Sequence, residues 1–163
     1  MNIAIIGTGN MAKGLAARFA AAGHAVTLGG RDTAKAESAA RELGVSAAPV
    51  ADAARAADVV VLAGPYGAVA DVIGTGGGFA GKVVVDITNP MTADFSGLSI
   101  GHTTSAAEEI QKRAPQAKVV KAFNTIFAQV LQNGGHAAGP AERVLALGVL
   151  GDVRSDRRRC GDG

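Results

Sequence analysis

The sequence predicts an α/β fold of the Rossmann type: a doubly wound, mostly parallel sheet with helices on both faces. Two observations lead to this prediction. Short apolar runs alternate along the chain with stretches of helical periodicity, which is the pattern of βαβ units. The first apolar run, at residues 3–6, is followed at once by a glycine-rich turn that opens a helix.

Strands are predicted where short, continuous apolar runs occur, because such runs suit strands buried on both faces of a parallel sheet. Turn signals end these runs: Gly64-Pro65 follows the fourth, and Thr88-Asn89-Pro90 follows the fifth. In chain order the predicted strands are residues 3–6, 25–28, 45–47, 58–63, 82–86, 119–123 and 141–149.

Helices are predicted where apolar residues recur at helical spacing. Met11, Leu15 and Phe19 lie four residues apart and indicate the first helix. Asp32 is a suitable N-cap for the second helix, and Gly44 is a suitable stop. The predicted helices are residues 11–23, 33–43, 51–57, 67–73, 104–113 and 126–131, with a loop at 91–101.

The composition indicates one globular domain that binds a small molecule. Of the 163 residues, 48% are hydrophobic and 18% charged, and the net charge of +2 is too small to indicate a nucleic-acid partner. The lone Cys160 excludes an internal disulfide, and the three histidines lack zinc-ligand spacing. No apolar run reaches membrane-spanning length and no signal peptide is evident, so we expect a cytoplasmic protein without a membrane partner.

We expect residues 1–150 to form one Rossmann-type domain. Residues 151–163 form an Arg-rich tail without apolar periodicity, and we predict that this tail is disordered.

The turn at residues 7–12 has the form GxGxxA and sits between a predicted strand and a helix. Gly7 allows a sharp turn, Gly9 lets a pyrophosphate approach the backbone, and Ala12 lets the helix pack on the sheet. Free N–H groups and the dipole at the helix start attract phosphates. Gly14 costs about 1 kcal/mol against Ala inside a helix, which a close approach of another element or of the ligand would explain.

The segment after the second strand favours NADP(H) over NAD(H). NAD sites usually place a carboxylate at this strand end, but here the strand runs into Gly30 and Arg31. A guanidinium suits a 2′-phosphate, and we expect Lys35 to reach the same group. Asp32 leaves NADH open as the alternative, because its carboxylate would serve a ribose hydroxyl if the turn were shifted by one residue.

Four motifs together resemble the NADP oxidoreductases that use coenzyme F420, and also the related NADPH domain of the STEAP metalloreductases. They are GTGNMAKGLA (7–16), GGRD (29–32), DITNP (86–90) and KAFNTIFA (121–128). The resemblance implies a Rossmann domain that binds NADPH along the carboxyl ends of its strands and exchanges a hydride with F420 or a flavin-like ring. It also implies a homodimer, and a C-terminal part of the family that this chain is expected to lack.

The resemblance also assigns site residues by their positions in these motifs. Besides Gly7 and Gly9, the implied cofactor contacts are Thr8, Asn10, Met11, Gly30, Arg31, Asp32, Lys35, Gly64, Pro65, Tyr66, Asn89, Pro90 and Ala122. Asn124 and Asn89 are the candidate catalytic residues on the acceptor side. For Asn124, a structural role in a turn is the alternative.

The expected function is hydride transfer between NADP(H) and a deazaflavin (F420) or flavin-like acceptor. Such a reaction needs two rings held face to face, so positioning suffices without a protein nucleophile or a metal. Tyr66 is followed four residues later by Ala70 rather than Lys, which disfavours a short-chain dehydrogenase. Two alternatives remain: a non-catalytic or truncated NADP(H)-binding module, and an NADP-dependent imine or metal reductase.

Overall fold

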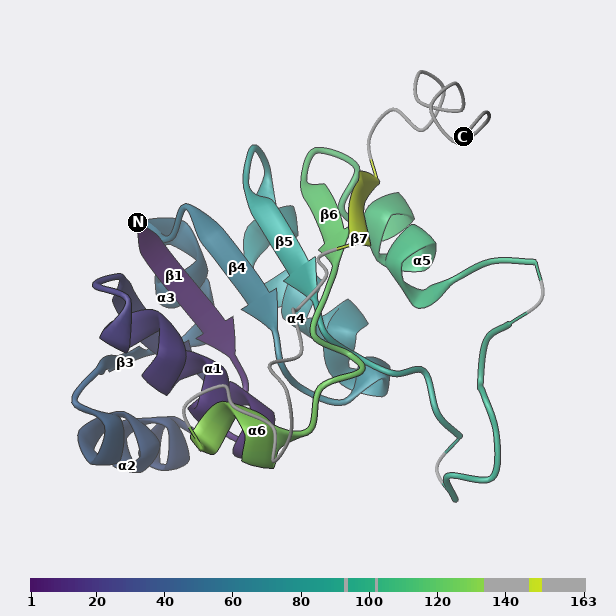
Figure 1. The fold of residues 1–163 in the computed structure, drawn as a ribbon. Helices are drawn as coiled ribbons and strands as arrows, with labels where there is room; N and C mark the ends of the chain where they lie inside the picture. Colours follow the sequence, from purple (N-terminus) through teal and green to yellow (C-terminus); the bar gives the residue numbers. More distant parts are fainter. Residues whose placement is uncertain (93, 102, 134–146, 151–163) are drawn as a thin grey trace, which may run out of the picture.

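A computed structural model of the chain describes residues 1–92, 94–101, 103–133 and 147–150. Its strands form one sheet in the order β3-β2-β1-β4-β5-β6-β7. The first six are parallel, and β7 pairs antiparallel with β6. The strands are β1 (Asn2–Ile6), β2 (Ala25–Gly29), β3 (Ser46–Ala48), β4 (Val59–Leu62), β5 (Val83–Asp86), β6 (Lys118–Lys121) and β7 (Leu147–Leu150) (Figure 1).

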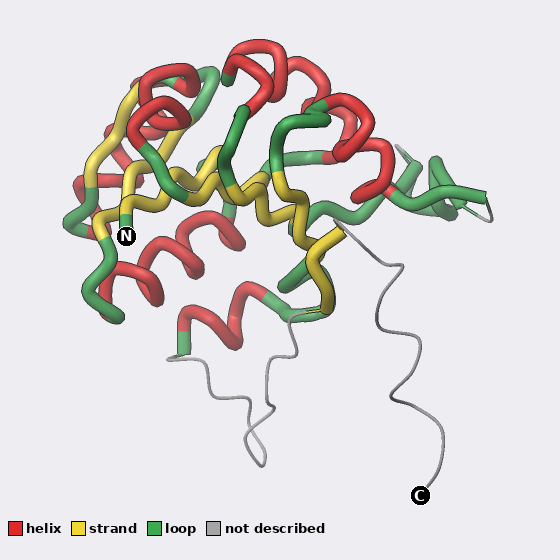
Figure 2. The backbone as a smooth tube through the Cα atoms, turned by 90° about the horizontal axis from the view of Figure 1, so that it is seen from above, coloured by secondary structure: helices red, strands yellow, loops and turns green. Residues whose placement is uncertain are grey.

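Helices cover both faces of the sheet, as Figure 2 shows with the strands as a layer between them. Helices α3 (Val50–Ala56), α4 (Val69–Thr75) and α5 (Ala106–Arg113) bury their apolar side chains in one core. Helices α1 (Asn10–Ala21), α2 (Thr33–Leu43) and α6 (Ala128–Gln132) contribute to the core on the opposite face. Two short 3-10 turns, Tyr66–Ala68 and Gly77–Phe79, flank α4. The predicted doubly wound, mostly parallel architecture is therefore confirmed.

Several predicted boundaries differ from the observed ones for local reasons. The helix predicted at 104–113 begins at Ala106, because the Ser105 side chain accepts a hydrogen bond from the Glu108 amide and Glu108 bonds back to the Ser105 amide. The strand predicted to reach residue 123 ends at Lys121, and Phe123 has a φ of 58° that a strand cannot contain.

Four other predictions are altered or fall partly or wholly outside the described residues. The helix predicted at 67–73 divides into the 3-10 turn at Tyr66–Ala68 and α4, and the one predicted at 126–131 begins at Ala128. The strand predicted at 141–149 appears as β7, but residues 141–146 lie outside the described residues. The tail at 151–163 lies outside them too, so its disorder stays a prediction.

The topology creates one crevice at the carboxyl ends of the strands. From β1 the chain continues outward to β2 and β3, whereas β4 lies on the other side of β1 and leads to β5 and β6. Connections that diverge from neighbouring strands leave a gap between them, and ligands of open α/β sheets bind at this switch point. The β1/β4 boundary is therefore where the fold itself provides a binding site.

Candidate cofactor-binding site

A cavity of about 1190 Å³ opens at the carboxyl ends of β1, β2 and β4. The turns that follow these three strands form its walls. Many of its lining residues are among the cofactor contacts predicted from the sequence: Gly7, Thr8, Gly9, Asn10, Met11, Gly30, Arg31, Asp32, Lys35, Gly64 and Pro65. Segments that are far apart in the sequence thus meet at the switch point between β1 and β4.

Gly7 forms the turn out of β1, and the geometry there admits only glycine. Its φ is 145°, and a Cβ at this position would lie 2.5 Å from the carbonyl oxygen of Ala63. The Gly7 amide donates to the carbonyl of Gly29 across a distance of 2.8 Å. The turn is therefore held tightly between β2 and the end of β4.

Gly9 lies at the N-cap of α1 and faces open space. No side chain caps the helix at this position, and the first turn carries no acidic residue. A Cβ built on Gly9 would have no neighbour within 4 Å. The start of α1 thus presents backbone N–H groups and the positive end of a 12-residue helix to the cavity, which is an arrangement that attracts anions.

The segment after β2 places two cations at the rim of the same cavity. Arg31 is exposed and takes part in none of the salt bridges found among the described residues. The Lys35 ammonium lies 3.6 Å from the Asp32 carboxylate, and both side chains are more than half exposed. Such an exposed pair contributes little stability, so both cations remain available to an anionic ligand.

The Asp32 carboxylate is committed to capping α2. Its Oδ1 accepts a hydrogen bond from the Lys35 amide at 3.1 Å. That bond is the main reason why the pKa of Asp32 is lowered, with the nearby Lys35 charge adding to the effect. Residue 32 is the N-cap as predicted, and Asp32 also lines the cavity, so a ribose contact by its carboxylate stays the alternative.

The cavity also has an apolar wall, which was not predicted from the sequence. Val50 begins α3, and Ala68 and Val72 belong to the 3-10 turn after Pro65 and to α4. Their positions just after β3 and β4 were the available signal. Phe95 also lines the cavity, with a φ of 58° and 78% of its surface exposed, and nothing in its sequence surroundings points to this placement.

Tyr66 lies apart from the large cavity, although it directly follows Pro65. It lines a separate cavity of about 120 Å³ between α4 and α5, together with Ile110 and Arg113. Burial is the main cause that raises the pKa of Tyr66, and the negative charge of Glu109 adds to it. The predicted cofactor contact of Tyr66 is therefore not reflected in the residues that line the large cavity.

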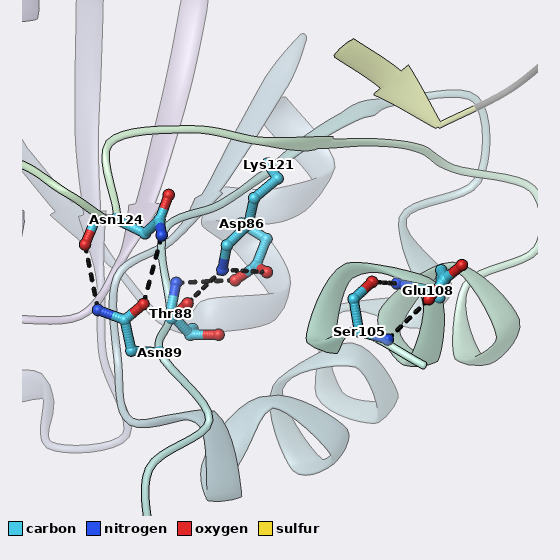
Figure 3. Close-up of polar contacts among 7 residues, drawn as sticks. All are labelled: Asp86, Thr88, Asn89, Ser105, Glu108, Lys121 and Asn124. Carbon is cyan, nitrogen blue, oxygen red and sulfur yellow. Dashed lines mark hydrogen bonds and ion pairs between the residues drawn. The ribbon is translucent and has the colours of Figure 1, made fainter. Parts of the chain in front are cut away.

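The acceptor-side candidates meet in the turns after β5 and β6. Asn89 Nδ2 donates to the carbonyl oxygen of Asn124 at 3.1 Å, and Asn124 Nδ2 donates to Asn89 Oδ1 at 3.4 Å (Figure 3). Ala122 is buried, and its amide donates to the carbonyl of Asp86. These residues and Pro90 lie at the carboxyl edge of the sheet, beyond β4, and do not line the large cavity.

Within the described residues, no group of three or more His, Cys, Asp or Glu side chains is placed to hold a metal ion. The same part of the chain contains no helix with the length and apolar character needed to traverse a bilayer.

Comparison with known proteins identifies the family of the chain. The family model for coenzyme F420-dependent NADP oxidoreductases matches residues 2–90, which is more than half of the chain. The chain belongs to this family. The match to the family model ends at Pro90. The matched residues therefore include the turn after β1, the segment that follows β2 and the DITNP motif at the end of β5.

Individual relatives extend the similarity beyond residue 90. An F420-dependent NADP reductase of Methanothermobacter thermautotrophicus is 36% identical over 148 residues, covering 80% of this chain and 64% of that protein. A protein assigned as an F420-dependent NADP reductase from Arthrobacter sp. FB24 has a solved structure with a TM-score of 0.77 and 34% identity, covering 85% of this chain and 69% of the other. The rat metalloreductase STEAP3 is 29% identical over 92% of this chain but only 29% of its own length.

The resemblance to F420-dependent oxidoreductases and to the STEAP domain is thus confirmed. The chain spans slightly less than two thirds of the length of the curated F420-dependent NADP reductase that it matches.

Proposed function

We propose that this family member binds NADP(H) and transfers a hydride between it and coenzyme F420 or a flavin-like acceptor. The proposal is carried by one observation, the geometry of the turn between β1 and the start of α1. A sharp glycine turn, an open backbone at Gly9 and an uncapped helix start face the same cavity as Arg31. These features suit a diphosphate next to a second phosphate.

Each part of NADPH has a matching region in this arrangement. The adenosine half fits between the apolar wall at Val50 and Val72 and the cations Arg31 and Lys35. The pyrophosphate fits the start of α1, where Gly9 leaves room. The nicotinamide half then extends across the switch point, toward the carboxyl ends of β5 and β6.

When bound, NADPH supplies the hydride that, with a proton, reduces the acceptor ring by two electrons. The task of the protein is to hold two planar rings in contact and in the correct orientation, which accounts for much of the rate enhancement in such reactions. Asn89 and Asn124, fixed against each other in the turns after β5 and β6, are the proposed acceptor-side residues. Each side-chain amide nitrogen has a second N–H besides the one donated to the other residue, and this second N–H is able to donate to a ring carbonyl.

A second candidate is an NADP(H)-binding module without catalysis. The match spans 64% of the curated Methanothermobacter reductase, so the remaining part of that reductase has no counterpart among the matched residues. Both functions share the same nucleotide site, and they differ in whether this chain alone binds and reduces an acceptor. For the intact protein we further propose a cytoplasmic location, as expected from the sequence, and a homodimer, as implied by the family resemblance.

Two measurements test the proposal in sequence. Titration with NADPH and with NADH, followed by nicotinamide fluorescence, is expected to show saturable binding with a clear preference for NADPH. Absorbance of F420 is then followed in the presence of NADPH, and bleaching that depends on the protein identifies an enzyme. Binding of NADPH without bleaching would support the module instead, and absence of NADPH binding would contradict both functions.

A further inference from the structure

Asp86 and Lys121 face each other at the carboxyl ends of β5 and β6. They are partners in the strand register, and Lys121 Nζ lies 2.9 Å from Asp86 Oδ2 (Figure 3). The Asp86 side chain is completely buried, whereas 25% of the Lys121 side chain is exposed. A buried carboxylate is stable only with a partner. This ion pair therefore holds the carboxyl ends of β5 and β6 in place relative to each other.

The ion pair holds both polar backbone groups of Thr88. The Thr88 amide donates to Asp86 Oδ1 at 2.8 Å, and Lys121 Nζ donates to the Thr88 carbonyl oxygen. The peptide groups on either side of residue 88 are therefore anchored to charges, and such charge-assisted bonds are the strong ones. Asn89, the next residue, starts from an anchored backbone.

The turn after β6 is attached to the same unit. The Ala122 amide donates to the Asp86 carbonyl at 3.1 Å. The Asn89 side chain donates to the backbone carbonyl of Asn124, whose own side chain donates to Asn89 Oδ1. None of these residues lines the large cavity that holds the proposed adenosine and pyrophosphate sites. A disturbance of the ion pair is thus expected to reach one end of the site without the other.

From these contacts we infer that Lys121 is a positioning residue for the nicotinamide end of the site. It acts through the Thr88 carbonyl and, with Asp86, sets the place of Asn89 and Asn124. The inference rests on the proposed function, because it requires the nicotinamide half to lie over the ends of β5 and β6. A purely structural role would instead weaken every part of the site equally.

Two variants remove the Asp86–Lys121 ion pair, and they are expected to destabilise the fold to different extents. Lys121→Met deletes the ammonium and leaves the Asp86 carboxylate buried without its partner, which is expected to destabilise the fold. The double variant Asp86→Asn/Lys121→Met leaves no buried charge, and the Asn oxygen still accepts from the Thr88 amide. This second variant keeps the test available if the first fails to fold.

Lys82→Met is the matched control. The Lys82 ammonium also donates to backbone carbonyls, those of Arg55 and Ala57, but at the opposite end of the same sheet. It loses comparable bonds without affecting the turns after β5 and β6. Any change in the control therefore reports a general effect on the fold.

The test compares the dissociation constants of NADPH and of adenosine 2′,5′-bisphosphate, which carries the adenosine half and the 2′-phosphate but no nicotinamide. In the Lys121 variants the constant for NADPH is expected to rise about tenfold, the equivalent of one charge-assisted hydrogen bond. The constant for the bisphosphate is expected to stay within about twofold, and the control within about twofold for both ligands.

Equal weakening of both ligands, or unchanged NADPH binding in the folded double variant, would overturn the positioning role of Lys121. A wild-type protein that binds neither ligand would overturn the proposed function, and this inference with it. Wild-type binding of both ligands therefore separates a failure of the inference from a failure of the proposed function.

Discussion

Gly14 of α1 packs directly against Leu131 of α6. A Cβ on Gly14 would lie 2.8 Å from Leu131 Cβ and 3.6 Å from the Ala128 carbonyl oxygen. This contact explains why a glycine stands inside α1. The sequence left two explanations open, a close approach of another element or of the ligand, and the first is observed. The same contact holds the segment that follows Asn124 against α1, the helix whose start is the proposed phosphate-binding site.

The Gly14 contact predicts that alanine is unfavourable there. In Gly14→Ala, overpacking costs about 1–3 kcal/mol and the gain in helix propensity returns about 1 kcal/mol. We therefore expect a net loss of about 1 kcal/mol in the free energy of unfolding, measured by urea titration. Gly74→Ala in α4 is the matched control, because a Cβ there has no neighbour within 4 Å. A Gly14→Ala protein as stable as that control would contradict the contact.

Arg31 is predicted to select NADPH over NADH. Its guanidinium is free of salt bridges within the described residues and borders the cavity next to the uncapped α1 start. Loss of bonds to a phosphate costs about 1.5–3 kcal/mol, so Arg31→Ala is expected to raise the dissociation constant of NADPH by about 10- to 100-fold. The constant for NADH is expected to change by less than about twofold.

Arg41→Ala is the control for Arg31, because Arg41 lies in the last turn of the helix that follows Arg31. It removes the same charge without touching the cavity lining. Fluorescence titrations of Arg31→Ala and Arg41→Ala with NADPH and with NADH measure the four dissociation constants that test this prediction. Equal losses of NADPH and NADH affinity in Arg31→Ala would exclude a 2′-phosphate role.

Asp32 is predicted to stabilise α2 in a manner that depends on pH. Its pKa is lowered in the folded protein from the ordinary value of 3.8, chiefly by the hydrogen bond from the Lys35 amide. The contribution to stability is therefore fully present above pH 3.8 and is lost as the pH falls through the folded pKa. Asp32→Ala is expected to melt at a lower temperature than the wild type at pH 7, with a smaller difference at pH 3.

Asp32→Asn separates the cap from the charge. Asparagine caps helices about as well as aspartate, so this variant is expected to keep the melting temperature at pH 7. It is also expected to bind NADPH at least as tightly, because it removes a negative charge beside the proposed phosphate site. Weaker NADH binding in this variant would instead identify Asp32 as a ribose ligand.

Local signals in the sequence predicted the sheet, most helices and the glycine turn that opens α1. The continuous apolar run before Gly7 and the GxGxxA pattern are short-range features, and backbone geometry at Gly7 and Gly9 follows from them. Arg31 was likewise predicted because the turn after the second strand carries this arginine and no carboxylate precedes it. These residues depend on neighbours in the sequence, which is why their roles are readable there.

Other parts of the site depend on contacts between distant segments. The bonds that Lys121 makes to Asp86 and to the Thr88 carbonyl span 35 and 33 residues, and the register of β5 against β6 creates them. Phe95 reaches the cavity from an irregular loop, and Tyr66 turns toward α5 rather than the cofactor corner. Periodicity and motif spacing carry no information about such placements.

The central claim is that the backbone around Gly9 and the start of α1 hold a diphosphate. Gly9 has a φ of −77° and a ψ of 179°, which alanine adopts freely, and its Cβ position is open. Gly9→Ala is therefore expected to lower the free energy of unfolding by no more than about 1 kcal/mol, while its methyl group blocks the approach of the phosphates.

The decisive measurement is the NADPH dissociation constant of folded Gly9→Ala relative to the wild type. An increase of at least about tenfold, with the melting temperature nearly unchanged, is the predicted result. Binding of NADPH with wild-type affinity by the Gly9→Ala protein would contradict the placement of the diphosphate at this corner.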